Sequence, residues 1–153
     1  MNRFFQRGGV WVAGQGVLLA AVALLPVFFR DCGFSPIPVI AGMVLMIVGA
    51  GVALAGAVAL GRNLTPFPKP SDSAQLVRHG IYAVIRHPLY TSVIAVTIGW
   101  ALVWQSWPAF LVAAMLIPFF HAKARHEERW LRERFPDYAD YERRVHRFIP
   151  WIY

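Results

Sequence analysis

Two polar clusters contain the side chains most suited to chemistry. The first is the run from Gly80 to Tyr90, which ends in Arg-His-Pro-Leu-Tyr and immediately precedes an apolar stretch. The second runs from His126 to Leu131, includes Glu127 and Glu128, and follows an apolar stretch that ends at Phe120. Imidazole, phenol and carboxylate groups can hydrogen-bond a polar small molecule, and ionisable groups at a membrane boundary are costly enough to indicate function. We therefore expect a site where a water-soluble reagent meets a lipid-borne substrate.

The composition predicts that this site belongs to a membrane protein. The chain has 153 residues, of which 58% are hydrophobic, and its mean hydropathy is +0.49. This exceeds what one soluble domain needs, and the apolar residues form long blocks. The formal net charge of +7 does not indicate nucleic-acid binding, because the basic residues lie in short segments between the apolar blocks rather than in one stripe.

Four apolar segments predict membrane-spanning helices at about 10–29, 37–60, 89–104 and 107–120. A charge-free run of 20 residues covers about 30 Å as a helix, which is one hydrocarbon core. The last two segments form one run that is too long for a single span, and Ser106 can cap a new helix in which Pro108 suits the first turn. The expected fold is a single all-α domain, residues 1–153, with about four transmembrane helices. The last two form a hairpin, and a cytosolic helical extension continues to about Arg134 before a tail.

Small residues and prolines suggest how the elements are arranged. Gly49 and Ala53, then Gly56 and Leu60, give faces on which helices could approach closely, although glycine is also simply common in membrane helices. The three prolines between 66 and 70 preclude a regular helix, and Ser71-Asp72-Ser73 favours a cap or turn. This connection is long for a compact bundle, which is itself a functional hint.

The basic residues predict an orientation. With four spans and an uncleaved first one, every basic segment falls on one side, which the positive-inside rule makes cytoplasmic. Both termini and the site are then cytoplasmic in a multi-pass protein. This topology brings His87, at the start of the third span, and Glu127, just past the fourth, to the same face.

Less specific interpretations exist for each cluster. Arg86 alone could be an interfacial anchor, and Glu127-Glu128 alone could be a solvated helix face paired with Lys123, Arg125 and Arg132. Their joint occurrence at one boundary favours a site.

Metal and thiol chemistry are not expected. His121, His126 and His146 do not suggest a metal centre, because the first two lie on different helix faces. The single cysteine, Cys32, is predicted to lie across the membrane and to be inert, and it excludes an internal disulfide.

A longer pattern links these residues. It reads Gly80-x-Tyr82-x-x-x-Arg86-His87-Pro88-x-Tyr90, then the hairpin, then Glu127-Glu128-x-x-Leu131, then Phe135-x-x-Tyr138-x-x-Tyr141-x-x-Arg144-Val145-x-Arg147-Phe148-Ile149-Pro150. From Gln75 to Trp151 the chain closely resembles the isoprenylcysteine carboxyl methyltransferase family, which is related to phospholipid methyltransferases. The resemblance implies an integral membrane enzyme that uses S-adenosylmethionine, with a lipophilic or amphiphilic small acceptor, membrane lipids around it and no nucleic acid.

The resemblance also implies site residues, within a cofactor region of about 74–90 and 121–151. The positions that match cofactor-contacting residues of the family are Leu76, Val77, Tyr82, His87, Pro88, Leu89, Tyr90 and Glu127. Lys123 stands where the family has a substrate-side arginine. A lysine lacks the bidentate fork that an arginine offers a carboxylate, so this departure weakens the case for a prenylcysteine carboxylate as the acceptor.

The chemistry expected of such a site is simple. A sulfonium-bound methyl group is already activated, so catalysis needs alignment and exclusion of water rather than a metal. A carboxylate acceptor needs no base, whereas an amine or hydroxyl does, and His87 or Tyr90 are conceivable bases. Two alternatives stay open: an NADPH-dependent membrane reductase of sterol-reductase type, whose aromatic-basic tail resembles residues 147–153, and a non-catalytic scaffold.

Overall fold

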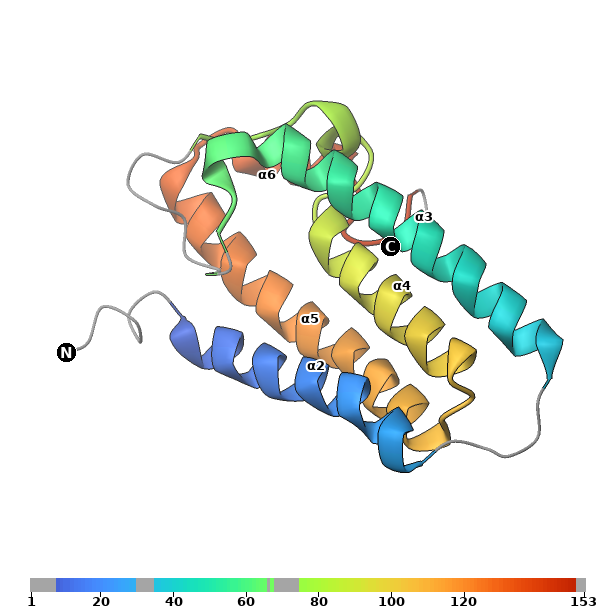
Figure 1. The fold of residues 1–153 in the computed structure, drawn as a ribbon. Coiled ribbons are helices and arrows are strands. Elements are labelled where there is room, and N and C mark those ends of the chain that lie inside the picture. Colours follow the sequence, from blue (N-terminus) through green and yellow to red (C-terminus); the bar gives the residue numbers. More distant parts are fainter. Residues whose placement is uncertain (1–7, 30–34, 66, 68–74, 151–153) are drawn as a thin grey trace.

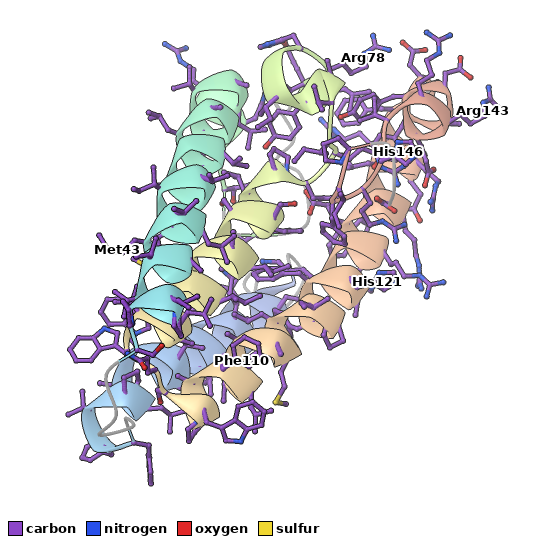
Figure 2. The ribbon with its side chains drawn as sticks, turned by 90° about the vertical axis from the view of Figure 1, so that its right-hand side faces the viewer. Met43, Arg78, Phe110, His121, Arg143 and His146 are labelled. Carbon is purple, nitrogen blue, oxygen red and sulfur yellow. The ribbon has the colours of Figure 1, made fainter. Side chains whose placement is uncertain are left out.

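The computed structural model describes residues 8–29, 35–65, 67 and 75–150. The described chain is all-α, and its long helices lie side by side (Figure 1). In order, the elements are α2 (Gly9–Phe28), α3 (Pro36–Leu60), the short 3-10 helices η1 (Gly61–Asn63) and η2 (Gly80–Ala83), α4 (Pro88–Val103), α5 (Trp107–Arg134) and α6 (Tyr138–Arg144). Helix α4 lies between α3 and α5, and α2 packs on α5 (Figures 1 and 2).

The helix lengths confirm the predicted membrane bundle. Helices α2, α3 and α5 are each long and apolar enough to cross a membrane, whereas α4 is a shorter apolar helix of 16 residues. The start of each differs from the predicted start by no more than one residue. Helix α5 is free of charge up to Phe120 and continues without a break to Arg134, as predicted. We therefore regard 107–120 as its membrane-spanning part and 121–134 as its polar extension.

The turn between α4 and α5 differs from the prediction in one detail. Ser106 is the N-cap residue of α5 and Pro108 lies in the first turn, but the Ser106 hydroxyl donates to the backbone carbonyl of Phe29 instead of capping α5. Gln105 binds the backbone of Ser35 through both ends of its amide, at 3.1 and 3.3 Å. The hairpin tip thus holds the adjoining ends of α2 and α3.

Glycines let α3 and α4 touch at the backbone. Gly42, Gly49 and Gly56 are buried and lie along the side of α3 that faces α4. A Cβ atom on Gly42 would lie 2.5 Å from the carbonyl oxygen of Gly99, and one on Gly49 would lie 2.9 Å from Val96. The close-approach interpretation of Gly49 and Gly56 is therefore correct, and the close approach of Gly56 to Leu89 and Pro88 fixes the start of α4 against α3.

We expect Gly42→Ala to destabilise the bundle. The added methyl group must displace backbone rather than a flexible side chain, and such overpacking costs about 1–3 kcal/mol. Thermal unfolding in detergent measures the effect. Gly51→Ala is the matched control, because a Cβ there meets nothing within 4 Å. Equal melting temperatures for the two variants would contradict the close contact.

Several predictions lie outside the described residues. They concern Cys32, the prolines at 66, 68 and 70, the turn at 71–73 and the residues after Pro150.

Candidate functional site

A pocket lies where the ends of α3, α4 and α5 meet the C-terminal segment. Figure 2 shows Arg78, Arg143 and His146 at this end, with Met43 and Phe110 further toward the opposite end. The lining residues come from distant parts of the chain: Leu60, Asn63, Thr65, Phe67, Gln75, Leu76, Val77, Tyr82, Arg86, His87, Leu89, Tyr90, Glu127, Leu131, Phe135, Tyr138 and Tyr141.

The two polar clusters converge, as predicted from the topology. Nδ1 of His87 lies 3.7 Å from Oε2 of Glu127, and Nε2 donates to Oε1 of Glu128 at 3.1 Å. The Tyr90 hydroxyl donates to Oε2 of Glu127 at 2.6 Å, and its ring stacks on His87 with centroids 5.1 Å apart. Residues that are 37 and 41 positions apart in the sequence thus form one hydrogen-bonded group at the pocket wall.

Behind this group, Glu128 is the centre of a buried charge cluster. Its side chain is fully buried, and Arg147 donates to both carboxylate oxygens, at 3.0 and 2.6 Å. A guanidinium nitrogen of Arg86 lies 3.3 Å away. Burial alone would raise the pKa of Glu128, but hydrogen bonds from His87 and Arg147 and the charge of Arg86 outweigh it and lower the pKa to about 2. Glu128 is therefore a carboxylate at neutral pH.

A second ion pair extends this cluster to α6. Arg132 donates to both oxygens of Glu142, at 2.8 and 2.6 Å, which lowers the pKa of Glu142. Arg86 also reaches Glu142 at 3.2 Å. Arg86 therefore joins the carboxylates of α5 and α6.

The segment after α6 pairs with residues 85–87, just before α4. The backbone N–H groups of Arg86 and His87 donate to the carbonyls of His146 and Arg147, at 2.9 and 3.1 Å, in a short parallel bridge. The Thr91 hydroxyl donates to the carbonyl of Phe148 at 3.0 Å. These contacts fix the backbone beside the pocket.

Comparison with known proteins identifies the family. Residues 37–138 match the family model described as phospholipid methyltransferase. The chain belongs to the phospholipid methyltransferase family. This is a family of membrane methyltransferases that use S-adenosylmethionine as the methyl donor.

The chain is similar to relatives with several different names. The chain is 30% identical over 116 residues to a probable protein-S-isoprenylcysteine O-methyltransferase of Oryza sativa. The alignment covers 72% of this chain and 60% of the relative. It is 25% identical over 115 residues to protein-S-isoprenylcysteine O-methyltransferase B of Arabidopsis thaliana, in an alignment that covers 72% of this chain and 58% of the relative. It is also 34% identical over 76 residues to cobalt-zinc-cadmium resistance protein CzcN of Cupriavidus metallidurans, in an alignment that covers 49% of this chain and 35% of the relative. The chain thus spans about 60% of the length of the plant relatives.

Most of the predicted cofactor residues of this phospholipid methyltransferase family member line the pocket. They are Leu76, Val77, Tyr82, His87, Leu89, Tyr90 and Glu127. Pro88 is buried at the first position of α4, lies against Gly56 and is not among the lining residues, so its predicted cofactor contact stays a prediction. Tyr82 is additionally held by its carbonyl, which accepts from the Tyr141 hydroxyl at 2.6 Å.

Lys123 lies beside the pocket rather than in its wall. The side chain is buried, donates to Oε1 of Gln15 in α2 at 2.7 Å, and lies over the Tyr90 ring at 5.1 Å. The amine is therefore held between α2 and α5, in contact with a residue that does line the pocket.

Sequence reasoning missed the partners of Glu128. It treated Glu127-Glu128 as either a site or a solvated face paired with Lys123, Arg125 and Arg132. Arg132 does lie 3.9 Å from Glu128, but Glu128 is fully buried and its closer cationic partners are Arg86 and Arg147. The available signal was the Arg147-Phe148 pair in the tail pattern. Among the residues the structure describes, no three His, Cys, Asp or Glu side chains gather to hold a metal ion.

Proposed function

We propose that this chain is an S-adenosylmethionine-dependent methyltransferase that acts on a lipophilic or amphiphilic small acceptor. The observation that supports this most strongly is the Glu127 carboxylate at the pocket wall, hydrogen-bonded by Tyr90 and adjacent to His87. It occurs in a chain whose family performs this reaction.

The lining residues fit the cofactor by chemical type. S-adenosylmethionine carries two cationic groups, a carboxylate, a ribose diol and an adenine ring. Glu127 can accept from the ammonium group or the diol, while Leu76, Val77 and Leu89 offer apolar surface to the adenine. Tyr82 and His87 can pack on the ring or bind its polar edges. In addition, the pocket contains buried hydrogen-bond donors that lack partners among the described residues, which suits a ligand rich in acceptors.

The protein's contribution to the reaction is mainly positional. The bound cofactor would supply a methyl group that the sulfonium already activates. His87 and Tyr90 are both hydrogen-bonded to glutamates, so the wall of the pocket is fixed before any ligand binds. A fixed wall holds donor and acceptor in line and excludes water, and these effects account for much of the rate in such transfers.

The acceptor would approach from the bilayer side, past Lys123. The buried amine of Lys123 and the amide of Gln15 form a polar spot between α2 and α5, next to Tyr90. An amphiphilic acceptor could place its polar group there and leave its apolar part among the helices. The basic residues at this end of the bundle, such as Arg78 and Arg143, support a cytoplasmic orientation of the pocket.

Ligand binding separates the candidate functions. We expect the protein purified in detergent to bind S-adenosylmethionine, but not NADPH, in isothermal titration calorimetry. Binding of NADPH instead would favour a reductase, and binding of neither would favour a scaffold. Incubation with methyl-labelled cofactor and a total lipid extract would then identify the acceptor, and the absence of labelled product from every acceptor class would contradict the proposal.

A further inference from the structure

Two buried polar atoms of pocket residues have no hydrogen-bond partner among the residues the structure describes. They are the hydroxyl of Tyr138 and Nε of Arg86. Both side chains line the pocket, one from the start of α6 and the other from the segment before α4. The third such atom, the indole nitrogen of Trp100, belongs to a residue that does not line the pocket.

The Tyr138 hydroxyl has no evident structural role. The side chain is only 1% exposed, and burying a hydroxyl without a partner costs stability, whereas phenylalanine would fill the same space without that cost. The neighbouring Tyr141 differs, because its hydroxyl donates to the carbonyl of Tyr82. Burial raises the pKa of Tyr138, and the nearby charge of Glu128 raises it further, so the hydroxyl stays protonated and remains a donor.

Two carboxylates close to Arg86 already have other partners. Glu128 accepts two hydrogen bonds from Arg147, and Glu142 accepts two from Arg132. The terminal nitrogens of Arg86 reach these same carboxylates, which leaves Nε as the remaining donor of this guanidinium. A pair of donors, one of them cationic, is suited to an anionic acceptor brought by a ligand.

We propose that the Tyr138 hydroxyl and Nε of Arg86 bind the carboxylate of the methionyl part of S-adenosylmethionine. This inference rests on the proposed function and adds a binding residue to it. Glu127 supplies the opposite charge for the ammonium group of the same zwitterion. The amino-acid part of the cofactor is then recognised by α5, α6 and the segment before α4 together.

Two non-reactive ligands test this assignment. S-adenosylhomocysteine keeps the amino-acid part, whereas 5′-methylthioadenosine lacks it and keeps the nucleoside. Calorimetric titration in detergent gives both affinities for the parent protein, Tyr138→Phe and Tyr141→Phe, and thermal unfolding gives the melting temperature of each without ligand. We expect Tyr138→Phe to bind S-adenosylhomocysteine at least about tenfold more weakly than the parent protein. Its affinity for methylthioadenosine should be unchanged, and its melting temperature should be unchanged or higher.

The control variant should behave differently. Tyr141→Phe leaves the Tyr82 carbonyl without its donor, so we expect a lower melting temperature and a similar fractional change for the two ligands. If Tyr138→Phe lost the same affinity for both ligands, the hydroxyl would contact the nucleoside, and the carboxylate assignment would be wrong. A lower melting temperature without a ligand-specific loss would make the hydroxyl structural, for instance bound to an internal water, and would overturn it as well. If the parent protein binds neither ligand, the proposed function fails instead.

Discussion

Glu128→Gln is expected to destabilise the protein severely and to abolish cofactor binding. The substitution removes the negative charge that Arg147 and Arg86 share in a fully buried position. Removing one partner of a buried ion pair typically costs about 3–5 kcal/mol, because the remaining charge is left uncompensated. His87 also loses the carboxylate that holds its Nε2. The melting temperature in detergent and calorimetric binding of S-adenosylmethionine measure the two effects.

An exposed ion pair provides the control for this prediction. Arg143 pairs with Asp140 on the surface of α6, and both side chains are mostly exposed. Exposed pairs contribute little to stability, so Arg143→Gln should melt and bind like the parent protein. A Glu128→Gln variant that melts with the parent would show that the buried cluster does not hold the site together.

Glu127→Gln is expected to act on binding with little effect on stability. Glu127 is partly exposed, and glutamine can still accept the hydrogen bond from Tyr90, so the helix and its contacts should persist. The lost charge removes the best acceptor for a cationic ligand group, and a hydrogen bond to a charged group is worth about 1.5–3 kcal/mol. We therefore expect the affinity for S-adenosylmethionine to fall by about one to two orders of magnitude.

His87→Ala should weaken binding similarly, whereas Cys32→Ser should be silent. Cys32 is predicted to lie across the membrane from the site and is outside the described residues. Titration of the three variants and the parent with S-adenosylmethionine checks these expectations together. Equal affinities for all four proteins would contradict the placement of the cofactor between the two clusters.

Much of the fold followed from the distribution of charge. The runs without Asp, Glu, Lys or Arg locate α2 and α3, and Ser106 with Pro108 marks the start of α5. The convergence of His87 and Glu127 followed from counting spans, because an even number of crossings returns the chain to the same face.

Other features could not be read from the sequence. Arg147 meets Glu128 because the segment after α6 returns to pair with residues 85–87, and a single parallel bridge has no periodic signature. The contact of Lys123 with Gln15 depends on which side of α2 packs against α5. Because α2 is almost entirely apolar, its sequence shows no polar and apolar faces from which that side could be predicted. Gly42, Gly49 and Gly56 recur every seven residues on the side of α3 that touches α4, but glycine is also common in membrane helices and Gly51 lies on another side, so the sequence alone did not single out this face.

The short length of α4 has a consequence for the lipid around it. Its 16 residues reach about 24 Å, several ångströms less than the hydrocarbon core of about 30 Å. A helix with such a hydrophobic mismatch either thins the leaflet locally or lets the headgroups sink beside its end. Because Tyr90 and Pro88 lie in the first turn of α4, acyl chains and headgroups would meet at the depth of the pocket. On the function proposed above, a lipid acceptor would present its polar end there without leaving its leaflet.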